Sequence, residues 1–142
     1  MLQNSVDTIS LTTAGLVVIK NRKLLLAFSK NKKAWYLPGG KVDHGETTIH
    51  ALIREIKEEL NIDMEPHELR FYTHISAPAF GEKKNVLMEQ DCFLYELKYL
   101  PRPAAEIESI RYFDITAYGT EQARVPGVIM IMQQLKNDNY ID

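Results

Sequence analysis

Three glutamates gather on one side of the strongest predicted helix, which covers residues 47–60. At about 100° per residue, Glu55, Glu58 and Glu59 fall within one sector, and apolar side chains fill a separate sector of the same helix. Like charges at these spacings destabilise a helix by about 0.2–0.5 kcal/mol per pair. A hard divalent cation such as Mg²⁺ or Mn²⁺ would offset the repulsion, because such ions prefer carboxylate oxygens. Taken alone, the three carboxylates fit a solvated acidic face equally well.

The loop before this helix carries glycines of the kind that metal and phosphate sites use. Gly39 and Gly40 allow the backbone to approach a ligand closely, and Gly45 allows a second sharp turn. A backbone carbonyl of this loop would add an oxygen ligand beside the carboxylates. Magnesium sites rely on few protein carboxylates and keep waters that can attack phosphorus. A glycine pair by itself is typical of any turn, so the loop is evidence for a metal or phosphate site only in combination with the helix.

The loop and the helix together resemble the signature of the Nudix hydrolases over residues 40–62. That pattern is a Gly, five residues, a Glu, seven residues, and then Arg-Glu-apolar-any-Glu-Glu-any-Gly-apolar. The positions that match at the required spacing are Gly40, Glu46, Arg54, Glu55, Ile56, Glu58, Glu59 and Ile62. The one departure is Asn61, where the family usually has Gly. Asn tolerates the positive φ that the position after a helix requires, so the departure weakens the match little. The eight positions that match at fixed spacing make the motif specific.

The resemblance implies metal-assisted attack of water on a nucleoside diphosphate linked to a group X. The implied ligands of Mg²⁺ or Mn²⁺ are the Gly40 carbonyl, Glu55, Glu58 and Glu59. Arg54 would orient the glutamates by charge-assisted hydrogen bonds, and Glu46 would brace the junction between loop and helix. The residue that takes the proton from the water varies within the family and is left open. The number of metals and the phosphorus attacked are open as well.

Other candidate residues lie outside the signature. The resemblance places a further acidic ligand in a loop before a late strand, where Glu106 is favoured over Glu108, although solvated glutamates are as common. The candidates for substrate contact are Trp35, Tyr36, Gly39, Pro78 and Phe80. Aromatic residues are more often core than substrate contacts, so Trp35 and Tyr36 could equally be buried.

The four histidines and the cysteine carry weaker signals. No metal-ligand spacing links His44, His50, His67 and His74, which we interpret as surface or satisfied histidines. Cys92 lies in a predicted strand and is interpreted as a small buried hydrophobe rather than a nucleophile.

The elements around the signature predict an α+β domain. Strands are expected at 10–19, 24–28, 69–76, 86–97 and 110–113, with a short aromatic segment at 35–37 and a closing helix at 128–135. This order predicts helices packed on a mixed sheet. The resemblance sharpens the expectation to a Nudix-type α/β/α sandwich with a mixed β-sheet between helices.

The composition sets the broad class. The chain has 142 residues, 45% hydrophobic and 25% charged, with a formal net charge of −2. These values predict a single domain over residues 1–142 and give no general attraction to nucleic acid or to an anionic membrane. With one cysteine and no visible secretory signal, we expect a cytoplasmic protein. Dimers are frequent in the resembled family, so a homodimer is left open.

The leading hypothesis is a Mg²⁺-dependent pyrophosphohydrolase acting on a small nucleotide. A nucleoside triphosphate, intact or damaged, would yield monophosphate and pyrophosphate. ADP-ribose is the alternative, because Pro78 lies sixteen residues after Ile62, a spacing that resembles a marker of ADP-ribose-directed members. Dinucleoside polyphosphates follow. A different class, a nucleotide-binding Nudix domain without catalysis, is opposed by the three glutamates. A capped-RNA hydrolase is disfavoured by the net charge.

Overall fold

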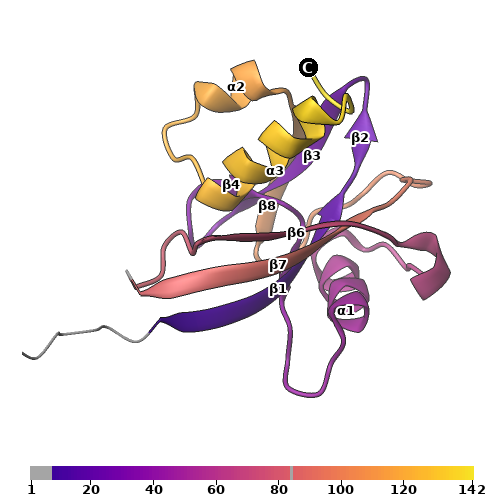
Figure 1. Cartoon of the computed structure of the whole chain (residues 1–142). Helices are drawn as coiled ribbons and strands as arrows, with labels where there is room; N and C mark the ends of the chain where they lie inside the picture. Colours follow the sequence, from indigo (N-terminus) through magenta and orange to yellow (C-terminus); the bar gives the residue numbers. More distant parts are fainter. Residues whose placement is uncertain (1–7, 84) are drawn as a thin grey trace, which may run out of the picture.

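The computed structural model describes residues 8–83 and 85–142, and its strands form two sheets with helices on both sides (Figure 1). The first sheet has the order β5 (Gly39–Lys41), β1 (Ile9–Val17), β7 (Val86–Leu94) and β6 (Arg70–Pro78). Its central pair, β1 and β7, is parallel, and the two outer pairs are antiparallel. The sheet is therefore mixed, as expected.

The second sheet has β3 as its central strand and joins strands from both halves of the chain. It contains β2 (Ile19–Lys20), β3 (Lys23–Ser29) and β4 (Ala34–Tyr36), and β8 (Ile107–Phe113) pairs with β3. Asn21 and Arg22, both with positive φ, form the hairpin turn between β2 and β3.

Helices cover both faces of the first sheet and complete the predicted sandwich. The helix α1 (Thr48–Leu60) packs against β1 and β5, and α3 (Pro126–Asn137) packs against β6 on the opposite face. A short α2 (Ile115–Gly119) and a 3₁₀ turn, η1 (Pro66–Glu68), complete the elements. The predicted fold class, an α/β/α arrangement around a mixed sheet, is thus confirmed.

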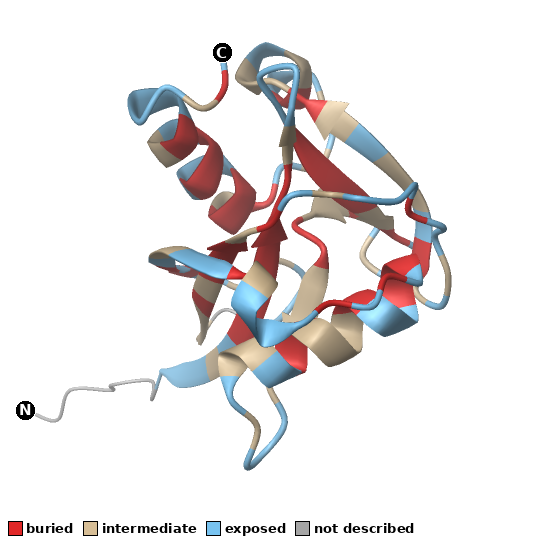
Figure 2. Cartoon of the chain, turned by 90° about the vertical axis from the view of Figure 1, so that its right-hand side faces the viewer, coloured by how far each residue is buried: buried red, intermediate tan, exposed pale blue. Residues whose placement is uncertain are grey.

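Alternation along β1 divides the core between the two faces of the sheet. Leu16 packs with Leu52 and Ile56 of α1, whereas Val17 packs with the group that includes Ile131 and Leu135 of α3. Successive strand residues point to opposite faces, so one strand serves both layers. Figure 2 shows the buried residues along the inner side of α3 and through the strands.

The structure corrects several predicted boundaries. β7 ends at Leu94 rather than at residue 97, and β8 begins at Ile107 rather than at residue 110. Thr47 caps α1 instead of belonging to it, since its side chain accepts a hydrogen bond from the His50 N–H. The strand β5 and the helix α2 were not predicted. Gly39–Lys41 has little strand propensity and is held as a strand by its pairing with β1.

The C-terminal end of α1 shows why Asn61 can replace the glycine of the signature. Asn61 has φ 58° and ψ 37°, and its side-chain amide donates a hydrogen bond to the Arg102 carbonyl at 2.9 Å. Asparagine tolerates this left-handed conformation better than most residues, and its side chain ties the helix end to the loop before β8.

Replacing Asn61 should therefore lower stability in a definite order. We expect Asn61→Ala to lower the free energy of unfolding by about 2 kcal/mol, because alanine is strained at this φ and lacks the amide. Asn61→Gly should lose only about 0.5–1 kcal/mol, because it keeps the conformation and loses only the hydrogen bond. Urea unfolding of the three proteins measures the order; a loss as large for Gly as for Ala would contradict the conformational argument.

A polar cluster covers the sheet next to the start of α1. His74 lies 2.7 Å from Asp91 through Nδ1 and 2.8 Å from Glu89 through Nε2. The Thr48 hydroxyl donates to the other oxygen of Asp91 at 2.9 Å. The hydrogen bonds to Glu89 and Asp91 raise the pKa of His74 above its ordinary value. The expectation of a satisfied surface histidine agrees with this arrangement.

The raised pKa of His74 predicts a pH-dependent contribution to stability. The pairing is complete below the unfolded pKa of about 6.5 and is lost as pH rises through the higher folded value. The loss of stability in His74→Gln relative to the parent protein should hence be larger at about pH 5.5 than at about pH 8.5. Urea unfolding at both values tests this, with exposed His44→Gln as the matched control. An equal difference at both pH values would refute it.

Among the residues that the structure describes, no helix is long and apolar enough to cross a membrane. The absence of a secretory signal was predicted from residues 1–7, which lie outside the described residues. The single domain, the cytoplasmic location and the homodimer stay predictions.

Candidate active site

The strand β5 places two glycines, Gly39 and Gly40, close to β1 and to the carboxylates of α1. Neither position has room for a side chain. Gly39 has φ +138°, and a Cβ there would lie 2.0 Å from the carbonyl oxygen of Ala14 on β1. At Gly40 a Cβ would lie 2.6 Å from the Glu55 carboxyl carbon. No real Cβ tolerates such contacts, so the glycines let β5 lie between β1 and the carboxylates of α1.

Glu59 is the buried carboxyl group of the helix. Its residue is only 8% exposed, and its Oε1 accepts a hydrogen bond from the Gly39 N–H at 3.0 Å. Burial, followed by the negative charges of Glu55, Glu58 and Glu106, raises the pKa of Glu59 to about 8, against the effect of that hydrogen bond. Burial raises the pKa of Glu55 as well. The protein thus holds carboxyl groups whose negative charge is poorly compensated.

Arg54 links the helix to the preceding loop. Its Nε donates to Oε2 of Glu46 at 2.9 Å, and its Nη2 donates to Oε1 of the same carboxylate at 2.8 Å. Nη1 donates to Glu55 at 2.8 Å, and Nη2 also reaches the Lys41 carbonyl at 3.1 Å. One guanidinium group therefore fixes the loop, the helix and β5 together. Its hydrogen bonds lower the pKa of Glu46 to about 2.

A cavity of about 460 Å³ opens beside these carboxylates. Its charged end is formed by Gly40, Glu55 and Glu59 together with Glu106 from the loop before β8. The rest of the lining holds the Lys32–Glu82 ion pair and a larger set of apolar and aromatic residues, among them Leu11, Tyr36, Leu37, Pro78, Phe80, Met88 and Val125. The volume lies within the usual range for small-molecule sites, and the lining combines carboxylates with apolar surface.

The structure brings most of the predicted site residues to this cavity. Those that line it are Tyr36, Gly39, Gly40, Glu55, Glu59, Pro78, Phe80 and Glu106. Tyr36 and Phe80 meet edge to face with ring centroids 6.2 Å apart, and the Tyr36 hydroxyl donates to the Phe80 carbonyl at 3.3 Å. The aromatic wall is therefore a rigid pair contributed by segments far apart in the sequence.

Three predicted site residues lie outside the cavity lining. Arg54 contacts the lining residues Glu55 and Lys41 by hydrogen bonds, and Glu46 in turn holds Arg54. The Glu58 side chain is 54% exposed, and its Oε1 lies 3.9 Å from Arg54. Its assignment as a metal ligand therefore rests on the resemblance alone and stays a prediction.

The structure does not support Trp35 as a substrate contact. Its ring packs edge to face against Phe28 and Phe113, at centroid distances of 5.2 and 5.0 Å. Because neighbouring residues of a strand point to opposite faces, β4 directs Tyr36 to the cavity and Trp35 to the core. The core interpretation is the one that fits this position.

Glu106, rather than Glu108, reaches the cavity. Its Oε1 accepts hydrogen bonds from the Asn31 N–H and, at 2.9 Å, from the Ser29 hydroxyl. These bonds, with the Asn31 N–H as the largest cause, lower the pKa of Glu106. Glu108 is exposed on β8. The preference for Glu106 therefore has a geometric basis, although its role as a ligand stays a prediction.

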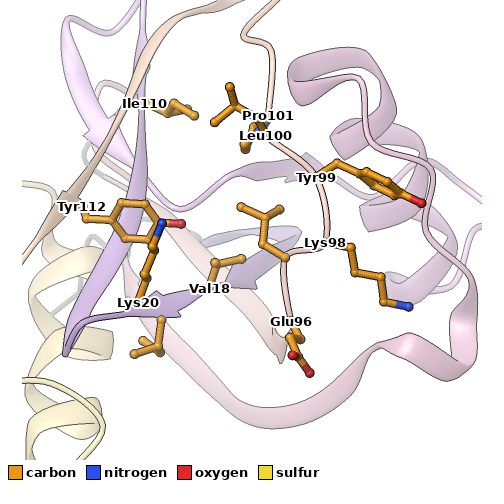
Figure 3. Close-up of a pocket in the computed structure, with 11 residues that line it drawn as sticks. Val18, Lys20, Glu96, Lys98, Tyr99, Leu100, Pro101, Ile110 and Tyr112 are labelled. Carbon is orange, nitrogen blue, oxygen red and sulfur yellow. The ribbon is translucent and has the colours of Figure 1, made fainter.

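A second hollow, of about 350 Å³, lies between β2, β8 and residues 96–101 (Figure 3). Val18, Ile110 and Tyr112 line it, together with Lys20 and Lys98. None of the signature carboxylates borders this hollow. The chemistry predicted from the sequence therefore belongs to the first cavity.

Comparison with known families matches this arrangement directly. The model of the NUDIX domain matches residues 4–131, which is most of the chain. The chain belongs to the Nudix family. Within it, the Nudix motif forms the charged end of the cavity, on β5 and α1.

Several relatives of this Nudix chain are named for an activity, and each aligns with only part of the chain. It is 28% identical over 119 residues to the human (Homo sapiens) 8-oxo-dGDP phosphatase, with 74% of this chain and 36% of that protein covered. It is 33% identical over 96 residues to the 8-oxo-dGTP diphosphatase of Buchnera aphidicola, with 67% and 71% covered. It is 36% identical over 90 residues to the RNA pyrophosphohydrolase of Ruthia magnifica, with 63% and 44% covered. The chain thus spans less than half the length of the human and Ruthia relatives.

Solved structures agree on the Nudix fold. The MutT protein of Methanosarcina mazei superposes with a TM-score of 0.75 at 17% identity, covering 95% of this chain and 99% of that chain. The MutT Nudix hydrolase of Burkholderia pseudomallei gives a TM-score of 0.68 at 22% identity, covering 88% and 96%. At these identities the likeness concerns the fold.

The donor set of this Nudix site fits a hard divalent ion. Glu55 and Glu59 offer carboxylate oxygens next to the backbone of Gly40, and burial disfavours their negative charge in the protein alone. A bound cation would favour the charged forms. Within residues 8–83 and 85–142, no three His, Cys, Asp or Glu side chains already form an ion site. Mg²⁺ completes its coordination with waters and substrate phosphates, so a closed protein cage is not required.

Sequence reasoning missed two polar residues in the same Nudix cavity, Thr13 and Gln90. Both are buried, at 6% and 9% exposure, and both line the cavity. The signal was present in β7, where Gln90 interrupts an inward row that also contains Met88 and Cys92. A polar residue on the apolar side of a strand marks either a hydrogen-bonded core position or a ligand contact.

Proposed function

We propose that this chain is a Mg²⁺-dependent nucleotide pyrophosphohydrolase, with a nucleoside triphosphate, above all an oxidised purine, as substrate. The products would be the monophosphate and pyrophosphate. The observation that carries the proposal is one cavity lined both by carboxylates of the signature and by aromatic and apolar side chains. The names of the human and Buchnera relatives, which concern oxidised guanine nucleotides, support this choice of substrate.

The two ends of the cavity suit the two parts of a nucleotide. The phosphates belong at the end formed by Gly40, Glu55 and Glu59, where Lys41 also lines the wall. The base belongs between the apolar walls, next to the Tyr36–Phe80 pair. This orientation places the phosphoanhydride beside the carboxylates.

The residues of the chain have separable roles in this proposal. Gly40, Glu55 and Glu59, with Glu58 and Glu106 as further candidates, would hold the ions. The bound ion would supply charge neutralisation on the phosphates and a more acidic water. Arg54 fixes the position of Glu55 through its Nη1, and Glu46 fixes Arg54. A carboxylate with a raised pKa, such as that of Glu55, is suited to accept a proton from water.

A product-resolved turnover screen tests the proposal. The substrates would be dGTP, 8-oxo-dGTP and 8-oxo-dGDP, with ADP-ribose, a dinucleoside polyphosphate and triphosphorylated RNA as the alternative classes. Each would be incubated with Mg²⁺, Mn²⁺ or EDTA, and products would be identified by mass. We expect metal-dependent release of pyrophosphate from a nucleoside triphosphate. Preferred turnover of ADP-ribose or RNA would replace the substrate class, and no turnover by a folded protein that binds nucleotide would favour a binding domain.

A further inference from the structure

Thr13 and Gln90 form the polar part of the cavity's inner wall. They are aligned with each other across the parallel pair of β1 and β7. Their neighbours two residues away on the same strands, Leu11 and Met88, are apolar and line the cavity as well, as does the aromatic pair Tyr36–Phe80. The two polar groups thus interrupt an apolar surface, which in the proposed orientation faces the base.

The hydrogen-bonding capacity of this pair is largely unused. The Thr13 Oγ1 is buried and has no partner in the part of the chain that the structure describes. The Gln90 Oε1 receives only a long contact from the Cys92 thiol, at 3.7 Å. For its amide nitrogen, no hydrogen bond occurs to the residues described. A buried polar atom without a partner is rare and costly, so the Thr13 hydroxyl is suited to pair with a ligand group in the cavity, and the Gln90 carboxamide lines the cavity beside it.

The Gln90 carboxamide lies over Gly15 of the neighbouring strand. A Cβ on Gly15 would lie 3.0 Å from the Gln90 side-chain carbon Cδ and 3.1 Å from its amide nitrogen. The same Cβ would lie 2.9 Å from Leu37. Glycine at position 15 therefore leaves the space that the carboxamide occupies. A carboxamide presents one acceptor beside one donor, which is a pattern for bidentate recognition.

We propose that Gln90 and Thr13 determine base specificity, by reading a base edge that carries a donor beside an acceptor. This inference rests on the proposed function, because it assigns the base end of the same cavity. Guanine and its C8-oxidised form distinguish such a reader. Unoxidised guanine presents two acceptors, N7 and O6, on one edge. Oxidation at C8 places a hydrogen on N7, so that this edge gains a donor beside the O6 acceptor.

Binding of the reaction products tests the inference without catalysis. Calorimetric titration with 8-oxo-dGMP and dGMP would be done on the parent protein, on Gln90→Met and on Thr13→Val. We expect the parent to prefer 8-oxo-dGMP, and Gln90→Met to weaken its binding about ten-fold while leaving dGMP nearly unchanged. Thr13→Val should weaken binding several-fold and raise the unfolding midpoint by a few degrees, because it removes an unpaired buried hydroxyl.

Matched controls separate binding from folding. Thr12→Val changes the exposed neighbour on the other face of β1, and Gln133→Met changes an exposed position of α3. Both should leave the two affinities unchanged. The inference is overturned if Gln90→Met keeps the parent's preference, or if the parent binds neither monophosphate. Specific binding with no turnover of any triphosphate would instead reject the proposed function and retain the reader.

Discussion

Replacing Glu59 by Gln is expected to lower turnover at least about 100-fold while the protein stays folded. Glu59 is the most buried carboxyl group at the charged end of the cavity, at 8% exposure. Glutamine keeps the shape and the oxygen that accepts from the Gly39 N–H, but it removes the charge that a divalent ion requires. Steady-state kinetics with Mg²⁺ on the best substrate of the screen measures the loss.

The same substitution should leave the metal-free protein at least as stable as its parent. Burial raises the pKa of Glu59 to about 8, which shows that the buried charge is unfavourable in the protein alone. A neutral amide avoids that cost. Glu68→Gln is the matched control, because Glu68 lies on η1, away from the cavity, and forms an ion pair with Lys98. It should keep full turnover; normal Mg²⁺-dependent activity in Glu59→Gln would remove Glu59 from the proposed machinery.

The contiguous signature predicted which side chains would gather beside one another, whereas several boundaries of the surrounding elements were predicted less well. Helical spacing predicted Glu55 and Glu59 on one side of α1, and in the structure both side chains line the same cavity. Spacing could not tell that Glu58 would be 54% exposed, because three residues within one sector can still differ in depth. That difference depends on β5, which lies against one side of the helix only.

The rest of the site depends on contacts between distant segments. β5 is a strand only because Ala14 and Gly15 of β1 pair with it, and its own residues have weak strand propensity. Likewise, Trp35 and Tyr36 are adjacent and chemically similar, yet one lies in the core and the other at the cavity. Local sequence contains the alternation of a strand but does not state which face will meet the ligand.

Thr13 and Gln90 illustrate a second limit. Each residue type is common in strands or at surfaces, so neither attracts attention alone. Their meaning comes from the parallel register of β1 and β7, which joins residues 77 positions apart on one wall. Parallel pairing of this kind is specified by the whole sheet, whereas the Nudix motif is contiguous in sequence.

Replacing Arg54 by Lys is the second change for which we expect a large effect, a fall in kcat of about 10–100-fold with little change in KM. The guanidinium group donates to Glu46 through two nitrogens and to Glu55 through the third. A lysine keeps the positive charge but cannot hold both carboxylates in this geometry. Glu55 should consequently lose its fixed position, while the base end of the cavity stays intact.

A matched control and a rescue distinguish positioning from folding. Arg22→Lys changes an arginine that also bridges several groups, Asp142 and Asn139 among them, but lies away from the cavity. It should keep full kcat. In Arg54→Ala, free guanidinium at a concentration too low to unfold the protein should restore part of the kcat, since it can occupy the space beside Glu46 and Glu55. Full activity in Arg54→Lys, or a loss in kcat matched by a loss of folded protein, would show that Arg54 does not position Glu55 for the reaction.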